Sequence, residues 1–365
     1  TMGRFLPIGL QIGLPSAWAN PPQASPQAQV HFNIRAQESR VADVMPIVES
    51  FLDNPLPVQF PTGLVSGTAD FASNGDDPWT LEGLARVKDG TVVTRGLPEP
   101  VQDLAGDVRF LGQVFDFEGV TARLGDLTAE AGGTIDLQAG YDLAGQFDPC
   151  TLGEVTRLFG TDIPVNVDGA FVADVTMTGT LRTPQLSTDV AAQNTVTIDQ
   201  VPFSTVTASA VLQAPTLAIE NLRAVPQAGG TITGSGQYSF AKAGAKTGGN
   251  LALNLNGDSL PANALGRPYG LPDTIALGSV FVDANVSGPV NQLTTTATWR
   301  APAGDYPARG DLRFANGTLQ FTDTFVQVAG GTVSGQGALA NRQWSADLVA
   351  RELQLNQLAT GVNGE

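Results

Sequence analysis

Two carboxylates in the stretch FDFEG, Asp116 and Glu118, have the residue type and spacing that could support catalysis. On a β-strand, residues two apart lie on one face, and Asp107 is close by in the sequence. Glycosidases hydrolyse sugars with two carboxyl groups roughly 5–10 Å apart. However, Phe115 and Phe117 occupy the alternate positions. Ordinary strand alternation therefore accounts for both carboxylates, and a carbohydrate-active enzyme is the least favoured of three functional hypotheses.

The other residue types that carry chemistry are scarce. His31 is the only histidine and lies in the strand-like stretch AQVHFNI, so a Ser-His-Asp triad would have to use it. Cys150 is the only cysteine, which excludes an internal disulfide and the usual zinc sites. The Gly-rich stretch GSGQYSF lacks the Lys-Ser or Lys-Thr of a phosphate loop. We therefore expect no enzymatic activity, no cofactor and no metal.

The composition predicts strands separated by turns. The 365 residues include 42 glycines and 24 prolines, and 15% of the residues are charged. The net charge is −16, with lysine only at positions 88, 242 and 246. Because phosphate neutralisation needs a basic surface, nucleic acid is an unlikely partner on physical grounds. No apolar run is long enough for a membrane-spanning helix.

Alternation of apolar and polar residues is the clearest local signal, and it predicts strands with one buried face. The stretch 171–181 places most of its apolar side chains on one face and Thr or Asp on the other, with Val172 as the exception, and "LALNLN" alternates in the same way. We predict that these faces form an apolar stripe. Its candidate residues are Phe171, Val175, Met177, Leu181, Leu251, Leu253, Leu255, Val280, Val282, Val286, Leu312 and Phe314.

An internal repeat is indicated by the phrases GGTIDL, GGTITG and GGTVSG, whose glycine pairs begin at 132, 229 and 330. A period on the order of a hundred residues indicates a unit that recurs along an axis. We interpret the glycine pairs as relief of crowding at a bend or bulge. Short helices are predicted between groups of strands, at 38–52, 151–160, 259–270 and 353–361, with Ser259 as a helix N-cap.

These signals predict a mainly all-β fold. We expect an elongated repeat of antiparallel strands, forming a lengthwise-folded sheet with an apolar interior and short helices between the repeats. The predicted organisation is an irregular linker at 1–30 followed by β-repeat modules at 31–160, 161–270 and 271–365, the last incomplete. The apolar faces have two interpretations: a closed, dry core, or an open channel in which acyl chains avoid water.

The cassette GGTIDL, YDLAGQFD, TLGEVTRLFG and VDGAFVADVTMTGTLRTPQLSTDVAA resembles the C-terminal half of the TamB (translocation and assembly module) family. The phrase VTMTGTLRTPQLS carries most of this resemblance, because a Gly-bearing strand followed by a Pro and another strand recurs in that family. The resemblance covers residues 30–365 and is greatest to cyanobacterial members, which are related to a chloroplast-envelope translocon component.

The resemblance implies a periplasmic, AsmA-like β-groove, attached to the inner membrane through a segment outside this sequence. It implies a role in outer-membrane protein assembly or secretion with a TamA-type barrel, through parts of the chain not present here. It also implies transport of phospholipid between membranes, with the acyl chains in the groove. The first hypothesis is this envelope protein. The second, from the residues alone, is an extracellular β-solenoid used for adhesion, with a closed core.

Overall fold

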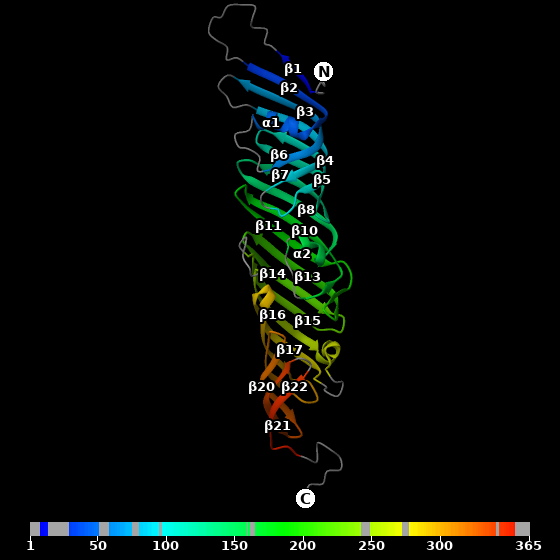
Figure 1. The fold of residues 1–365 in the computed structure, drawn as a ribbon, viewed down its shortest axis with the longest axis vertical. Helices are drawn as coiled ribbons and strands as arrows, with labels where there is room; N and C mark the ends of the chain where they lie inside the picture. Colours follow the sequence, from blue (N-terminus) through cyan, green and yellow to red (C-terminus); the bar gives the residue numbers. More distant parts are fainter. Residues whose placement is uncertain are drawn as a thin grey trace, which may run out of the picture. The chain divides into compact units, whose positions relative to one another are not determined.

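The protein is an all-β protein with short helices (Figure 1). The structure, a computed structural model, describes residues 8–13, 29–50, 58–74, 80–94, 97–158, 160, 165–241, 249–271, 277–340 and 343–354. It is 73% strand and 9% helix, and its antiparallel sheet is not closed. The predicted fold class is therefore confirmed.

The chain divides into two compact units. Unit 1 consists of Thr1–Cys150 and Ala173–Ser187, and unit 2 of Thr151–Val172 and Thr188–Glu365. These units are defined by the contacts within them and not by repetition. The three modules at 31–160, 161–270 and 271–365 consequently stay a prediction.

Unit 1 is built from strands that pair antiparallel with their neighbours along the chain. Its elements are β1 (Ile8–Gly13), β2 (Gln29–Arg40), α1 (Val41–Glu49), β3 (Gln59–Asn74), β4 (Thr80–Val93), β5 (Val101–Leu111), β6 (Val114–Leu124), β7 (Leu127–Asp136) and β8 (Gly140–Thr151), with most of β10 (Ala170–Thr180) and the first half of β11 (Thr183–Ala192). Strand β1 pairs with β2, so residues 8–13 are not irregular as predicted. The rest of the predicted linker, up to residue 28, lies outside the described residues.

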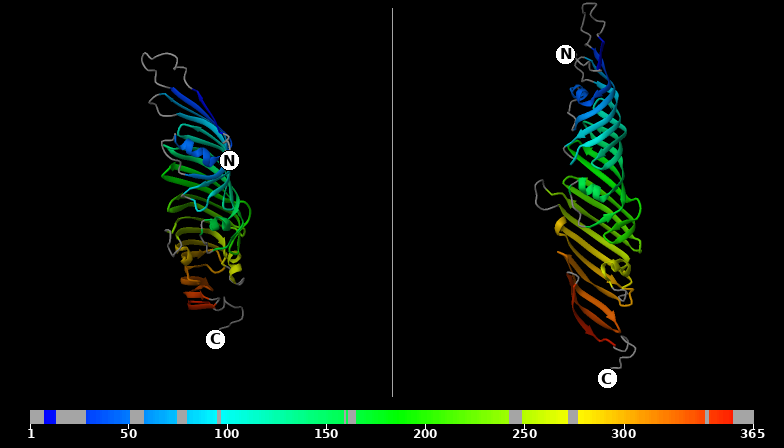
Figure 2. Two further views of the ribbon diagram at one scale, coloured as in Figure 1. Left: turned by 45° about the horizontal axis from the view of Figure 1, so that its top comes forward. Right: turned by 45° about the vertical axis from the view of Figure 1, so that its right-hand side comes forward.

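A row of β-bulges crosses the sheet of unit 1. Register shifts occur in five successive pairings, from β2–β3 to β6–β7, and each lies beside the shift on the neighbouring strand. Glu38, Asp89, Asp103 and Gly119 in this bulge row have a positive φ. Because each bulge bends its strand and increases the local twist, the row curls the sheet. Figure 2 shows the strands of unit 1 crossing one another in projection as the sheet wraps round.

The core of unit 1 lies on the inner face of this curled sheet. Phe71 is fully buried and is paired across the sheet with Phe32 on one side and Leu81 on the other. The rings of Phe32 and Phe71 stack with centroids 4.8 Å apart. The buried cluster consists of Ile34, Ala69, Phe71, Leu81, Phe110, Phe115 and Leu137. Apolar side chains at every second position thus fill one end of the inner face.

Unit 2 continues the same antiparallel pattern. Its elements are α2 (Leu152–Leu158), β9 (Val167–Asp168), the ends of β10 and β11, β12 (Val196–Ile198), β13 (Val201–Gln213), β14 (Thr216–Pro226), β15 (Thr231–Ser239), β16 (Asn250–Pro261), α3 (Ala262–Gly266), η2 (Arg267–Tyr269), β17 (Ser279–Pro289), η3 (Val290–Gln292), β18 (Thr294–Ala301), β19 (Ala308–Ala315), β20 (Thr318–Val328), β21 (Gly331–Ala340) and β22 (Gln343–Arg351). Strand β16 pairs with β15 in an uninterrupted register from Thr231 to Ser239.

The predicted helices at 38–52, 151–160 and 259–270 are confirmed, with shorter bounds. Helix α1 begins only at Val41, because β2 extends to Arg40. Ser259 is not an N-cap as predicted: it lies in β16 with a φ of 53°, next to a register shift, and Pro261 precedes α3. The prediction at 353–361 falls mostly on residues outside those described.

The three glycine pairs are not structurally equivalent. Gly132 lies within β7, opposite the bulge of β6, and a Cβ on Gly133 would meet the carbonyl oxygen of Asp142. The pair at 229–230 instead lies in the turn that precedes β15, and at 330–331 the first glycine lies in a turn and the second begins β21. Positive φ angles at Gly133, Gly229 and Gly330 explain why glycine is used in all three. The repeated phrase therefore reflects one backbone requirement, a positive φ, which occurs within a strand in one copy and at a turn in the other two.

Candidate functional site

The inner face of unit 1 holds an apolar cavity of about 190 Å³. Strands β2 to β8 and helix α1 all contribute to its lining. The lining residues are Ile34, Ala36, Val41, Val44, Met45, Val48, Val58, Phe60, Val65, Gly67, Thr68, Ala69, Leu84, Ala85, Val87, Leu104, Gly106, Val108, Phe110, Phe115, Phe117, Val120, Ile135 and Tyr141. The curled sheet therefore surrounds a space that its own core does not fill.

Strand alternation and the bulge row together produce this cavity. In β6, Phe115 and Phe117 line the cavity, whereas Asp116 and Glu118 alternate with them. Gly106 lies at the bulge row, and a Cβ there would contact Val120 at 2.7 Å. Small residues at this row let neighbouring strands approach closely while the sheet bends. The bend separates side chains that a flat sheet would bring into contact.

Helix α1 covers one side of the cavity. Its first residue, Val41, is 3% exposed and packs with Ala36 and Val65 in a second small core. Val44, Met45 and Val48 are spaced so that they share one helix face, and all three line the cavity. Figure 1 shows α1 lying against β3, and α1 makes its contacts with β2 and β3. The helix is thus held on the sheet mainly by its apolar face, with one exposed ion pair between Arg40 of β2 and Asp43.

Polar side chains are nearly absent from the lining. Within the part of the chain that the structure describes, Thr68 and Tyr141 are the only lining residues with a polar side chain, and none of the lining residues is charged. Tyr141 is in β8 directly opposite Ile135 of β7. Burial raises the pKa of the Tyr141 hydroxyl, so the group is protonated at neutral pH and can donate a hydrogen bond. The cavity consequently offers a hydrocarbon environment with one phenolic donor.

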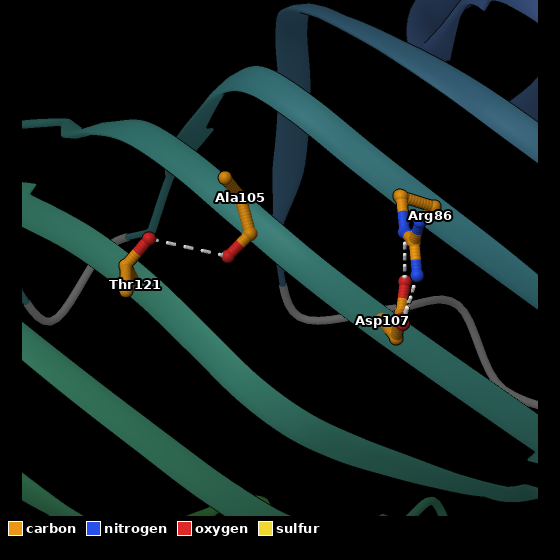
Figure 3. A network of polar contacts seen from close by, with 4 residues as sticks. All are labelled: Arg86, Ala105, Asp107 and Thr121. Atoms are coloured by element: carbon orange, nitrogen blue, oxygen red, sulfur yellow. Dashed lines mark hydrogen bonds and ion pairs between the residues drawn. The ribbon is translucent and has the colours of Figure 1, made fainter.

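The outer face of the same strands is polar. Arg86 of β4 donates from Nε and Nη2 to the two carboxylate oxygens of Asp107 in β5, at 2.6 Å each (Figure 3). The hydrogen bonds lower the pKa of Asp107 and raise that of Arg86. Thr121 of β6 donates to the carbonyl oxygen of Ala105 at 3.4 Å. Because the Arg86 side chain is 65% exposed, this pair contributes little stability but keeps the outer face hydrophilic.

The predicted apolar stripe divides between the two units. Val175, Met177 and Leu181 belong to unit 1, and the other nine residues belong to unit 2. Val280 is buried and Phe314 is 44% exposed, whereas the remaining ten are half-buried: Phe171, Val175, Met177, Leu181, Leu251, Leu253, Leu255, Val282, Val286 and Leu312. In unit 2, Leu253 pairs with Val286, and both Val286 and Phe314 pair with Thr295. Their role in ligand binding stays a prediction.

The cavity-lining residues of unit 1 are not among those predicted from the sequence. The signal for them was present, because the lining residues Val65, Gly67 and Ala69 alternate with polar residues or threonine along β3. Alternation identifies an apolar face, but it does not show that the sheet curls or that a helix covers it. The curl of the sheet depends on the bulges, and bulges do not produce a periodic pattern in the sequence.

The remaining candidates do not assemble into a catalytic site among the described residues. Glu118 is exposed and pairs across the strands with Asp107, whose carboxylate is held by Arg86. His31 lies in β2 with its Nε2 atom 3.6 Å from Asp70 Oδ1 and its side chain 63% exposed. Across the described ranges, no group of three or more His, Cys, Asp or Glu side chains is placed to hold a metal ion.

Unit 2 has a broad, open hollow of about 970 Å³ over β14 to β20. Its lining is mixed: it includes Leu255 and Leu312 of the predicted stripe as well as polar side chains. Some of the polar side chains bind one another across the strands. Asn256 Nδ2 donates to Asp283 Oδ1 at 2.6 Å, and Asn285 Nδ2 donates to Asn254 Oδ1 at 2.9 Å.

No protein-family model, curated protein or solved structure matches this chain. Among the described residues, none of the helices has the length and apolar character that crossing a bilayer requires. The class of protein that the structure itself defines is an open antiparallel β-sheet protein with an apolar cavity on the inner face of unit 1.

Proposed function

We propose that this protein binds lipid acyl chains on its inner apolar face, as a segment of a TamB-like envelope protein that carries phospholipid between membranes. The observation that supports this proposal most directly is the uncharged, almost wholly apolar lining of the cavity in unit 1. The resemblance of residues 30–365 to the TamB family supports the same assignment independently.

The size of the cavity is consistent with part of an acyl chain. A cavity of about 150 Å³ lined by Leu, Ile and Phe is large enough for benzene, which has six carbons. In proportion, the 190 Å³ here accommodates about eight carbons. Removing eight methylene groups from water is favourable by about 6 kcal/mol, at roughly 0.8 kcal/mol each. The free energy gained when a short stretch of chain moves from water into this cavity is therefore sufficient for weak, reversible binding.

The arrangement of the lining also suits a flexible hydrocarbon chain. Seven neighbouring strands, β2 to β8, each contribute at least one lining residue. Because the sheet curls, these strands surround one space, and a ligand there would be contacted by side chains from several of them. A hydrocarbon core of about 30 Å contains two layers of acyl chains, so one whole chain reaches about 15 Å. The cavity would therefore hold part of one acyl chain.

In the cell, we propose that the protein works in the periplasm, attached to the inner membrane through a segment outside this sequence. Its partner would be a TamA-type outer-membrane barrel, and it would assist assembly or secretion of outer-membrane proteins. These features follow from the resemblance alone. The lipid-binding role has the additional support of the cavity.

Native mass spectrometry of the purified protein, with organic extraction and lipid analysis, tests the proposal. Ala85 lines the cavity, and Ala85→Phe adds a ring where the acyl chain would lie. We expect the wild-type protein to retain phospholipid and Ala85→Phe to lose most of it. Thr128→Phe is the matched control, because Thr128 is exposed on β7 and does not line the cavity.

Two results of this experiment would contradict the proposal. Equal lipid content in the wild type and in a folded Ala85→Phe variant would show that lipid binds elsewhere. Protein free of lipid, even after incubation with phospholipid vesicles, would favour the second hypothesis, an adhesion protein with a closed core. Circular dichroism of each variant shows whether the sheet is intact.

A further inference from the structure

Among the described residues that line the cavity of unit 1, Tyr141 is the one best placed to recognise the polar part of a ligand. It lies in β8, opposite Ile135, and Ile135 lies opposite Phe115 on the next strand. All three residues line the cavity. Thr68, the other polar lining residue, lies in β3 between Gly67 and Ala69 at a position that alternates away from the buried Ala69. The phenol is therefore the polar anchor at the β8 end of the lining.

The hydroxyl group of Tyr141 makes no hydrogen bond with any of the described residues. A half-buried phenol gains stability when it finds an acceptor, because a polar group in apolar surroundings is costly when unpaired. The residues around it in the cavity are hydrocarbon or aromatic side chains and cannot supply that acceptor. The Tyr141 oxygen is not one of the buried polar atoms that lack a partner, so water can reach it, and the carbonyl oxygen of a ligand would replace that water.

The charge of the lining limits which acceptor is suitable. None of the described residues that line the cavity is Lys, Arg or His, and the protein as a whole has a net charge of −16. A buried carboxylate is strongly unfavourable without a cation or several hydrogen-bond donors. One phenol does not meet that need. A neutral carbonyl oxygen, in contrast, is satisfied by a single donor.

We propose that the cavity of unit 1 selects acyl esters over free fatty acids, with the Tyr141 hydroxyl donating a hydrogen bond to the ester carbonyl oxygen. This inference rests on the proposed function, because it assumes that the cavity receives an acyl chain. It adds the class of ligand and the residue that recognises it. The ester bond of a phospholipid or of another acyl lipid would satisfy the same contact.

Displacement of the neutral fluorophore N-phenyl-1-naphthylamine at neutral pH tests the inference. The competitors are decane, methyl decanoate and decanoate, which share a chain but differ in the polar group. In the wild type we expect methyl decanoate to bind at least about tenfold more tightly than decanoate, because an unpaired charge is excluded. In Tyr141→Phe the affinity for methyl decanoate should fall about three- to tenfold, the loss of one neutral hydrogen bond, with decane unchanged.

Tyr238→Phe in unit 2 is the matched control, since Tyr238 does not line the cavity, and it should change none of the three affinities. The inference is overturned if Tyr141→Phe leaves the methyl decanoate affinity unchanged or if decanoate binds as tightly as the ester. Loss of decane binding in Tyr141→Phe also overturns it, because Tyr141 would then act only by packing. If the wild type binds none of the three competitors, the proposed function fails together with this inference.

Discussion

Truncating Phe71 should destabilise unit 1 far more than truncating a residue that lines the cavity on the same inner face. Phe71 is 0% exposed, stacks on Phe32 and is directly opposite Leu81. Val108 also belongs to the inner face, but it is only half-buried and lines the cavity. The two residues thus separate the filled part of the inner face from the open part.

The expected magnitudes follow from burial. Phe71→Ala removes a fully buried ring and leaves a void, which costs about 3–5 kcal/mol. Val108→Ala removes two carbons, worth about 1.6 kcal/mol if fully buried, so half-burial gives about 1 kcal/mol. With a urea m-value of about 2 kcal/mol per molar, the unfolding midpoints should fall by about 2 M and 0.5 M.

Urea unfolding should be followed by hydrogen exchange of peptides from β2 to β4, because a chain with two compact units does not have to unfold in one transition under denaturant. This readout assigns the loss of stability to unit 1. A cost for Val108→Ala close to that for Phe71→Ala would refute the reasoning, because it would mean that the inner face is packed solid throughout. A Phe71→Ala cost under about 1 kcal/mol would refute the assignment of the core.

Three further predictions concern the polar face, a close backbone approach and the cavity tyrosine. The pKa of Asp107 is lowered in the folded state, so this carboxylate stabilises the fold at pH values above its ordinary pKa. That stabilisation is lost as the pH falls through the folded pKa. Between neutral and acid pH, the free energy of unfolding of Arg86→Ala should therefore decrease less than that of the wild type. Gly140→Ala should destabilise unit 1 by more than the roughly 1–2 kcal/mol that positive φ alone costs, because a Cβ there would meet the carbonyl oxygen of Gly179; thermal unfolding measures this loss. The raised pKa of Tyr141 means that folding favours the protonated phenol, so stability should fall as pH rises above about 10, and Tyr141→Phe should reduce that fall in alkaline unfolding.

Much of the fold could be predicted from local patterns. Alternation in β10 and β16 gave strands with one half-buried face, and the short helices were found within the predicted ranges. The boundaries were less predictable. Ser259 has the residue type of an N-cap, but the register shift in β16 places it in the sheet with a positive φ. Tertiary pairing overrode the local preference, since the strand gained hydrogen bonds with β17 that a longer helix would lose.

The candidate site was less predictable than the fold. The residues chosen from the sequence, such as Leu253 and Val282, lie on strongly alternating strands of unit 2. The cavity instead lies where alternation is interrupted, at the bulge row of unit 1. A bulge shifts the alternation by one residue, so it weakens the periodic signal at the same place where it bends the sheet. A search for regular alternation is therefore biased against the curved region.

The same bulges explain why a cavity can persist next to a dense core. In a flat sheet, apolar side chains on one face need a second layer to exclude water, and α1, nine residues long, is too short to cover seven strands. Curling brings residues of distant strands, such as Ile34 in β2 and Ile135 in β7, around one space. Phe71 and Leu81 pack into the core without lining the cavity, whereas Phe110 and Phe115 belong to both. Small residues such as Gly106 at the bulge row line the cavity beside these rings. One curved face thus carries a packed core and, next to it, a space that its side chains do not fill.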